Sequence, residues 1–351
     1  MPHRTIVNSD QMLVGIFLCL VSDSLIRPLA GGAALSAYGR VISAVICAGV
    51  VYLMLRMMFR GCASEAFIAV LAGKSTVSKP VLGLLTASFL LGAGRSLQQT
   101  EKFYRYVTGE GLSIAVLMCI VLAVSLYAAF SGFETVLRAG SVLLFFLACS
   151  IVLILVGNAP QMRLENLQIP TSPLQDIWSS CTKGFNLTPE LLLIAVFAHS
   201  CRQKNPSSIL RNSLLLTVVV DLLLTVVSEL VMGQFEALQV QPIHTLARLG
   251  GISVFRRLDA VHVSIWLLVS IFRTALLCVG LGEVLRPPIA PRYRQAALWC
   301  VAVPVLVVAG CMYIIPEGIQ QWVETGLVFA GAVSIWYAVT KEKKKWGKES
   351  G

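Results

Sequence analysis

The stretch Lys183-Gly184-Phe185-Asn186-Leu187-Thr188-Pro189-Glu190 decides how this chain is expected to fold. It lies inside the apolar segment 176–200, between Ile177 and the uninterrupted apolar run 191–198. Gly, Asn and Pro so close together disfavour a continuous helix, and the run that follows is too short to cross a bilayer alone. The stretch therefore predicts a helix that is interrupted within a membrane.

The composition indicates an integral membrane protein. Of the 351 residues, 56% are hydrophobic and 13% are charged, whereas a soluble domain averages about 45–50% apolar and about 25% charged residues. A soluble enzyme, a disordered protein and a nucleic-acid binder are therefore disfavoured. Long apolar runs without strand alternation predict about ten transmembrane helices, at 11–30, 35–58, 80–105, 111–130, 139–157, 176–200, 209–232, 259–284, 296–315 and 319–340.

These segments predict a single transmembrane domain over residues 1–340, followed by a basic tail at 341–351. The ten segments divide into two repeats of five, at about 11–157 and 176–340, so that the first and sixth segments are equivalent. The first segment is also irregular, because Ser22-Asp23-Ser24 and Arg27-Pro28 follow its apolar start. Breaks at equivalent places in two halves are typical of transporter sites, where freed main-chain groups and half-helix ends hold a small zwitterion.

The net charge of +10 fits a membrane topology better than a nucleic-acid partner. With the N-terminus in the cytoplasm, that side carries 17 Lys and Arg residues and the other side carries 10, leaving Arg273 uncounted inside a segment. The positive-inside rule then predicts that both termini are cytoplasmic and that the basic residues meet anionic membrane lipids. The ten cysteines form no CxxC pair, and neither a metal site nor a cofactor is expected.

The candidate ligand-binding residues lie at the two breaks or deep inside an apolar segment. Asp23 could receive a ligand's ammonium group, bind a proton, or pair with Arg27 one helical turn away. Glu190 could bind ligand or simply cap the second half-helix. Arg273 needs a carboxylate partner, which the ligand, Asp221 or one of the two acids above could supply. The full set is Ser22, Asp23, Ser24, Gly184, Phe185, Asn186, Thr188, Glu190 and Arg273.

Two sets of motifs stand out in the chain. The first consists of Pro242-Ile243-His244-Thr245-Leu246-Ala247-Arg248, Phe255-Arg256-Arg257-Leu258-Asp259-Ala260, Trp266 and Phe272-Arg273, and the second is Arg95-Ser96-Leu97-Gln98-Gln99-Thr100-Glu101-Lys102-Phe103. Both resemble the B subunit of bacterial spore germinant receptors, and the first set is the more specific. The resemblance covers nearly the whole chain. The chain departs from the family pattern at Ser22-Asp23, where the family often has Gly, and at Arg256, which replaces an acidic residue.

The resemblance implies the amino acid–polyamine–organocation superfamily, with a LeuT-like five-plus-five inverted repeat whose first and sixth helices are broken. It also implies that the protein is located in the inner membrane of a bacterial cell or spore and that it has A-type and C-type partner subunits. Arg95, Arg257 and Asp259 are then candidates for gating or partner contact, although the latter two could simply anchor a helix at the membrane interface.

The predicted function is therefore a membrane-embedded B-type subunit that binds a small nutrient such as an amino acid and helps to trigger germination. Two alternatives remain open. One is an autonomous amino acid transporter coupled to protons through Asp23 or Glu190, and the other is a ligand-free scaffold or ion-conducting subunit. The sequence has no GxSxG, HExxH or P-loop motif, so no enzyme is expected.

Overall fold

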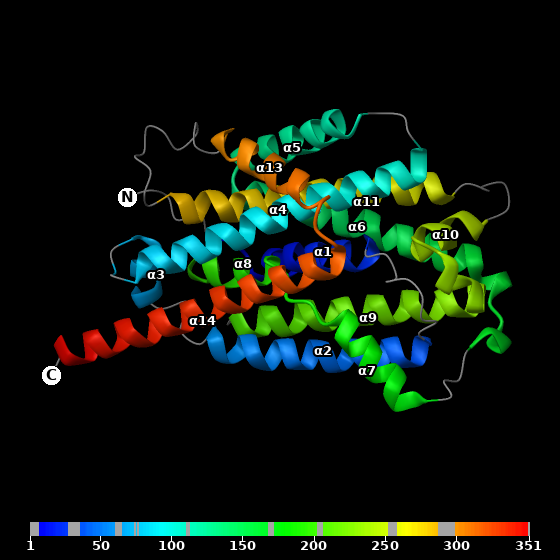
Figure 1. Ribbon diagram of the computed structural model, residues 1–351, viewed down its shortest axis with the longest axis horizontal. Coiled ribbons are helices and arrows are strands. Elements are labelled where there is room, and N and C mark those ends of the chain that lie inside the picture. Colours follow the sequence, from blue (N-terminus) through cyan, green and yellow to red (C-terminus); the bar gives the residue numbers. More distant parts are fainter. Residues whose placement is uncertain are drawn as a thin grey trace.

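The computed structural model shows a bundle of helices (Figure 1). It describes residues 7–26, 36–59, 65–73, 75, 77–109, 113–167, 172–201, 206–251, 258–286 and 299–349. Within these ranges the strand-like pairing consists of one isolated β-bridge, between Val7 and Cys201. The prediction of an all-α fold is confirmed for the part of the chain that the structure describes.

Thirteen α-helices and four short 3-10 helices lie within the described ranges. The α-helices are α1 (Ser9–Ile26), α2 (Ala37–Met58), α3 (Glu65–Leu71), α4 (Ser78–Thr108), α5 (Ile114–Phe130), α6 (Phe133–Asn158), α7 (Pro173–Gly184), α8 (Glu190–Val196), α9 (Pro206–Met232), α10 (Pro242–Leu249), α11 (Leu258–Leu285), α13 (Ala302–Cys311) and α14 (Glu317–Glu349). The 3-10 helices are η1 (Ala159–Gln161), η2 (Leu164–Asn166), η3 (Ala198–Ser200) and η4 (Gly233–Leu238).

The helices are those of a membrane protein. Within the described residues, α2, α4, α6, α9, α11 and α14 are long and apolar enough to cross a bilayer, while α5 and α13 are shorter apolar helices. Their outward faces carry large hydrophobic side chains that no other helix covers, such as Leu53, Met57 and Phe145. Water would penalise so much exposed apolar surface, and lipid does not.

Helix α1 lies in the middle of the bundle, where Figure 1 shows it in dark blue between the α4–α11 pair and the α2–α9 pair. It contacts α6, α8, α9 and α11. At its start, the Val7 amide donates to the carbonyl of Ser200 at 3.0 Å. This bond ties the beginning of α1 to the segment that follows α8. Near the end of α1, Asp23 accepts a hydrogen bond from Asn186, so the two irregular regions of the sequence are neighbours in space.

The two predicted breaks have different outcomes. Between α7 and α8 the chain is non-helical from Phe185 to Pro189, as the sequence predicts. In contrast, α1 continues as a regular helix through Ser22, Asp23 and Ser24, so the predicted break at these three residues is wrong. The polar side chains did not break the helix because Asp23 finds partners on neighbouring helices. Arg27-Pro28 lies outside the described residues.

Candidate ligand-binding site

The interruption between α7 and α8 has a local cause. Helix α7 ends at Gly184, and the Phe185 amide closes its last turn by donating to the Cys181 carbonyl at 2.9 Å. Pro189 has no amide hydrogen to continue a helix and instead precedes the first residue of α8. Carbonyls at the end of α7 therefore lack the helical partners that a continuous helix would give them.

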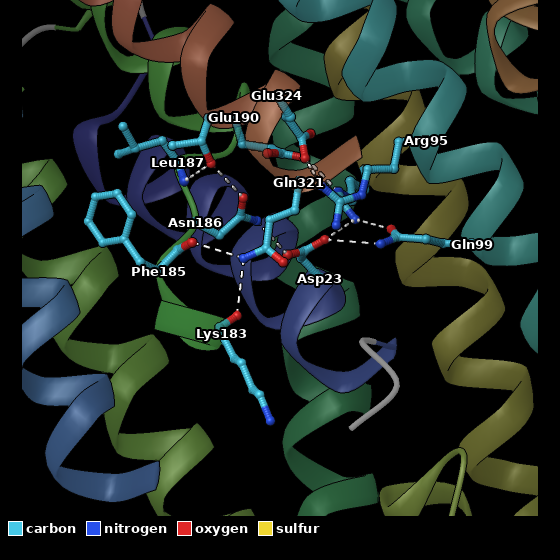
Figure 2. A network of polar contacts seen from close by, with 12 residues as sticks. Asp23, Arg95, Gln99, Lys183, Phe185, Asn186, Leu187, Glu190, Gln321 and Glu324 are labelled. Carbon is cyan, nitrogen blue, oxygen red and sulfur yellow. Dashed lines mark hydrogen bonds and ion pairs between the residues drawn. The ribbon is translucent and has the colours of Figure 1, made fainter. Parts of the chain in front are cut away.

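Helix α14 supplies partners for this interrupted main chain (Figure 2). The Gln321 amide nitrogen donates to two carbonyl oxygens, that of Lys183 at 3.1 Å and that of Phe185 at 2.9 Å. One turn further along, the Thr325 hydroxyl accepts from the Leu187 amide at 3.3 Å and donates to the side-chain oxygen of Asn186 at 3.2 Å. The interrupted segment is thus held in a defined conformation by a helix far away in the sequence.

A buried charged cluster lies beside the interruption. The Arg273 guanidinium of α11, which has no exposed surface, donates through Nε to Glu190 Oε1 at 2.5 Å. Its Nη1 lies 3.2 Å from Asp23 Oδ1 and donates to Gln99 Oε1 at 2.9 Å. Asp23 also accepts from Gln99 at 3.3 Å and from Asn186 at 3.3 Å. The cluster therefore joins α1, α4, α8 and α11 to the interrupted segment.

Because the cluster is buried, each of its charges depends on its partners. A charge inside the bundle is costly, and its partner offsets that cost only when the two groups are in direct contact. Of the carboxylates that the sequence offers to Arg273, the structure brings Asp23 and Glu190 to it. Two of the three guanidinium nitrogens of Arg273 are therefore in contact with carboxylates of the protein itself.

Some polar atoms around the cluster have no hydrogen-bond partner among the described residues. They are Arg273 Nη2, Glu190 Oε2, Thr188 Oγ1 and Ser22 Oγ, each with essentially no exposed surface. Buried polar groups are nearly always satisfied, by protein, water or ligand. These atoms include a positively charged hydrogen-bond donor, Arg273 Nη2, and a carboxylate acceptor, Glu190 Oε2. The cluster thus has one unused group for each end of a zwitterion.

A second buried ion pair lies next to the first. Arg95 of α4 donates to Glu324 of α14 (Figure 2), and both side chains are buried. This pair fixes α14 to α4 on the same face from which Gln321 and Thr325 reach the interrupted segment. Arg95, which the sequence offers as a gating residue, is therefore in direct contact with a helix that holds the candidate site.

The structure brings together most of the predicted site residues. Asn186 and Glu190 meet Asp23 and Arg273 within the cluster. Thr188 and Ser22 are buried, and their hydroxyl oxygens have no hydrogen-bond partner among the described residues. Gly184 is exposed at the end of α7, and Phe185 contributes its carbonyl. The side chain of Ser24 and the whole of Arg257 lie outside the described residues, and Asp259 is half-buried in the first turn of α11.

Four residues of this network were not among the predicted site residues: Gln99, Gln321, Glu324 and Thr325. The sequence gives a weak indication of three of them. Gln321, Glu324 and Thr325 are at helical spacing and form a polar face within the apolar segment 319–340. No group of three or more His, Cys, Asp or Glu side chains that could hold a metal occurs in the described part of the chain.

A comparison of sequences now decides the family. The profile of the spore germination protein family, also called spore permease, matches residues 7–317. The chain belongs to this family. It is not a family of enzymes, and the match includes α1, the interrupted segment and Arg273. No curated protein matches the chain at a significant level.

The fold has a counterpart among solved structures. Mhp1, a nucleobase-cation-symport-1 family transporter solved in a closed conformation with bromovinylhydantoin bound, superposes with a TM-score of 0.58. The match covers 93% of this chain and 77% of Mhp1 at 13% identity, so it establishes a common LeuT-type fold and nothing about ligands. A manganese transporter from Eremococcus coleocola aligns over 95% of this chain and 76% of its own, at 12% identity and with a TM-score of 0.48.

Proposed function

We propose that this spore germination protein is the membrane-embedded B-type subunit of a germinant receptor and that it binds a small amino acid at the junction of α7 and α8. One observation carries the proposal. The interrupted main chain of 185–189 lies directly beside the buried Asp23–Glu190–Arg273 cluster. Main-chain carbonyls and a carboxylate oxygen suit an ammonium group, and the free nitrogen of Arg273 suits a carboxylate.

The architecture we propose is ten transmembrane helices in a five-plus-five inverted repeat, with helix six broken and helix one continuous over α1, the repeats at about 11–157 and 176–340, and both termini cytoplasmic. Helices α7 and α8 are then the two halves of helix six. The Mhp1-like fold and the match of every predicted apolar segment to a described helix support this arrangement. Residues 341–351 form the cytoplasmic tail, which meets anionic membrane lipids.

Ligand binding would act by shifting a population of conformations. A ligand that occupies the junction of α7 and α8 favours the arrangement in which its polar groups are best satisfied, and only that difference in affinity can drive the change. The network already links this junction to α1, α4, α11 and α14. In a receptor, A-type and C-type subunits in the inner membrane of the spore would read the resulting movement.

Germination of spores that carry defined variants tests the proposal. Spores lacking the chromosomal copy of this chain are complemented with wild type, Asn186→Ala or Glu190→Gln, and the fall in optical density is followed over a panel of amino acids. We expect the two variants to need at least tenfold more amino acid for the same rate, while Glu134→Gln, an exposed control on α6, behaves as wild type. An unchanged response in both site variants would favour a ligand-free scaffold or ion-conducting subunit and contradict the proposal.

A second candidate function follows from the fold. Since the chain shares its fold with a transporter over most of its length, it could move an amino acid across the membrane alone, with protons coupled through Asp23 or Glu190. Uptake of labelled amino acid into proteoliposomes that contain only this chain separates the two. Strong uptake that a proton gradient drives would favour the transporter, and binding without uptake would favour the receptor subunit.

A further inference from the structure

Gln321 holds an unusual position for a side chain of a membrane-spanning helix. Its single amide nitrogen serves two main-chain carbonyls at once, those of Lys183 and Phe185, just where α7 stops (Figure 2). Neither oxygen belongs to the regular hydrogen-bond pattern of α8 or α14. The Gln321 amide therefore occupies a two-carbonyl acceptor site that the helix interruption creates.

This acceptor site suits a positive nitrogen better than a neutral one. A primary ammonium group brings three N–H donors, and hydrogen bonds from a charged donor are roughly twice as strong as neutral ones. The surrounding network adds to this preference, because its charged side chains comprise three acids, Asp23, Glu190 and Glu324, and two bases, Arg95 and Arg273. The side chain of Lys183 is exposed and points away from these groups in Figure 2.

The site is also reachable, in contrast to the cluster behind it. Gln321 and Phe185 are half-buried and Gly184 is exposed, whereas Arg273 and Glu190 have no exposed surface. The two carbonyls therefore belong to a partly exposed segment, whereas the charged groups of Arg273 and Glu190 are enclosed. The amide of Gln321 is the group that a ligand would have to displace.

We propose that Gln321 is an internal competitor that sets the affinity for ligands with a primary ammonium group. In the ligand-free protein its amide occupies the carbonyls of Lys183 and Phe185, and the ammonium group of the ligand takes its place. This inference rests on the proposed function, because it assigns the ammonium end of the ligand. It makes Gln321 a specificity-determining residue, since ligands that lack N–H donors gain nothing from displacing it.

Binding of two cations to the purified full-length protein tests the inference. Methylammonium chloride is titrated as a free primary ammonium, and tetramethylammonium chloride serves as a cation without N–H donors; thermal shift gives the half-saturating concentrations. We expect Gln321→Leu to bind methylammonium about tenfold more tightly than wild type, because displacement of neutral hydrogen bonds no longer opposes binding. Its affinity for tetramethylammonium should not change.

A matched control is Gln161→Leu, since Gln161 also donates to a main-chain carbonyl, that of Leu249 at 2.9 Å, but in an exposed turn away from the site. It should bind both cations as wild type does. Equal or weaker binding of methylammonium to Gln321→Leu, with binding intact in wild type, would overturn the inference and leave the proposed function standing. An equal gain for both cations would also overturn it. Absence of methylammonium binding in wild type and variant alike would overturn both.

A second variant keeps the test decisive if Gln321→Leu fails to fold. Gln321→Lys places a tethered ammonium group at the two carbonyls. We expect this variant to melt at a higher temperature than wild type and to bind methylammonium at least tenfold more weakly. A Gln321→Lys protein that binds methylammonium as well as wild type would contradict the competition between the side chain and the ligand.

Discussion

Substitution of Arg273 by Met is the most direct test of the buried cluster. The change puts an unbranched apolar side chain of similar length in place of arginine. It removes the nitrogens that contact Glu190 at 2.5 Å, Asp23 at 3.2 Å and Gln99 at 2.9 Å. Both acids are then buried without their cation. Removal of one partner from a buried ion pair costs about 3–5 kcal/mol of stability, and two abandoned carboxylates place the expected cost at the upper end, about 5 kcal/mol.

The neighbouring substitution Glu190→Gln should cost much less. It leaves Arg273 paired with Asp23 and replaces the carboxylate acceptor of one guanidinium hydrogen bond by a neutral amide oxygen, for a loss of about 1–2 kcal/mol. The double variant Arg273→Met/Glu190→Gln removes one of the two abandoned carboxylates. We therefore expect it to be more stable than Arg273→Met alone, with a coupling free energy of at least about 1 kcal/mol between the two positions.

The free energy of unfolding, measured by titration with SDS in mixed micelles and followed by tryptophan fluorescence, gives all of these values. Arg138→Met is the control, because Arg138 forms an exposed ion pair with Glu134 on α6 and should change stability by less than about 0.5 kcal/mol. The reasoning would be refuted if Arg273→Met cost no more than this control. It would equally be refuted if the costs of the two single substitutions simply added in the double variant.

Three further changes probe the surroundings of the site. Gly92→Ala should destabilise the protein by about 1–3 kcal/mol, because a Cβ at Gly92 would lie 2.6 Å from Pro189 Cγ, whereas Gly83→Ala, with no atom within 4 Å of its new Cβ, should not; thermal unfolding distinguishes the two. Thr325→Val should cost about 1–3 kcal/mol, since it removes the acceptor of a buried main-chain amide, and no loss on chemical unfolding would contradict that bond. Burial lowers the pKa of His244 below its ordinary value of 6.5, so the unfolded chain takes up a proton before the folded one does. Stability should then fall as the pH drops below about 6.5, and a His244→Phe variant should lose this part of the pH dependence; an identical pH profile would argue against it.

Features that act locally in the chain were readable from the sequence. The segment predicted at 80–105 is α4, Ser78–Thr108, and the segment predicted at 209–232 is α9, Pro206–Met232. The break between α7 and α8 was readable for the same reason, since Gly184 and Pro189 limit the helix wherever it lies. Arg273 could be assigned to a carboxylate because a buried guanidinium has few other partners.

Features that depend on distant partners were not readable. Gln321 contacts Phe185 across 136 residues, and no local pattern tells whether Gln320 or Gln321 of α14 will meet a broken segment. Gln99 illustrates the same problem, since its amide bridges Asp23 and Arg273 from a third helix. A pairing of this kind follows from the packing of helices, which a single sequence does not encode in any short window.

The regularity of α1 changes what each half of the molecule contributes to the site. Where the family pattern often has glycine, which disfavours a helix by about 1 kcal/mol, this chain has Ser22-Asp23 and remains helical to Ile26. Its main-chain groups are then used within the helix, and α1 offers the carboxylate of Asp23 instead. The interrupted segment after α7 offers main-chain carbonyls. Within the described residues α1 and the interrupted segment therefore play unlike parts, since α1 gives a carboxylate and the interrupted segment gives neutral main-chain acceptors. We therefore expect a ligand that lies between them to place a positive nitrogen toward both, so that small ammonium compounds bind more tightly than neutral or anionic nutrients.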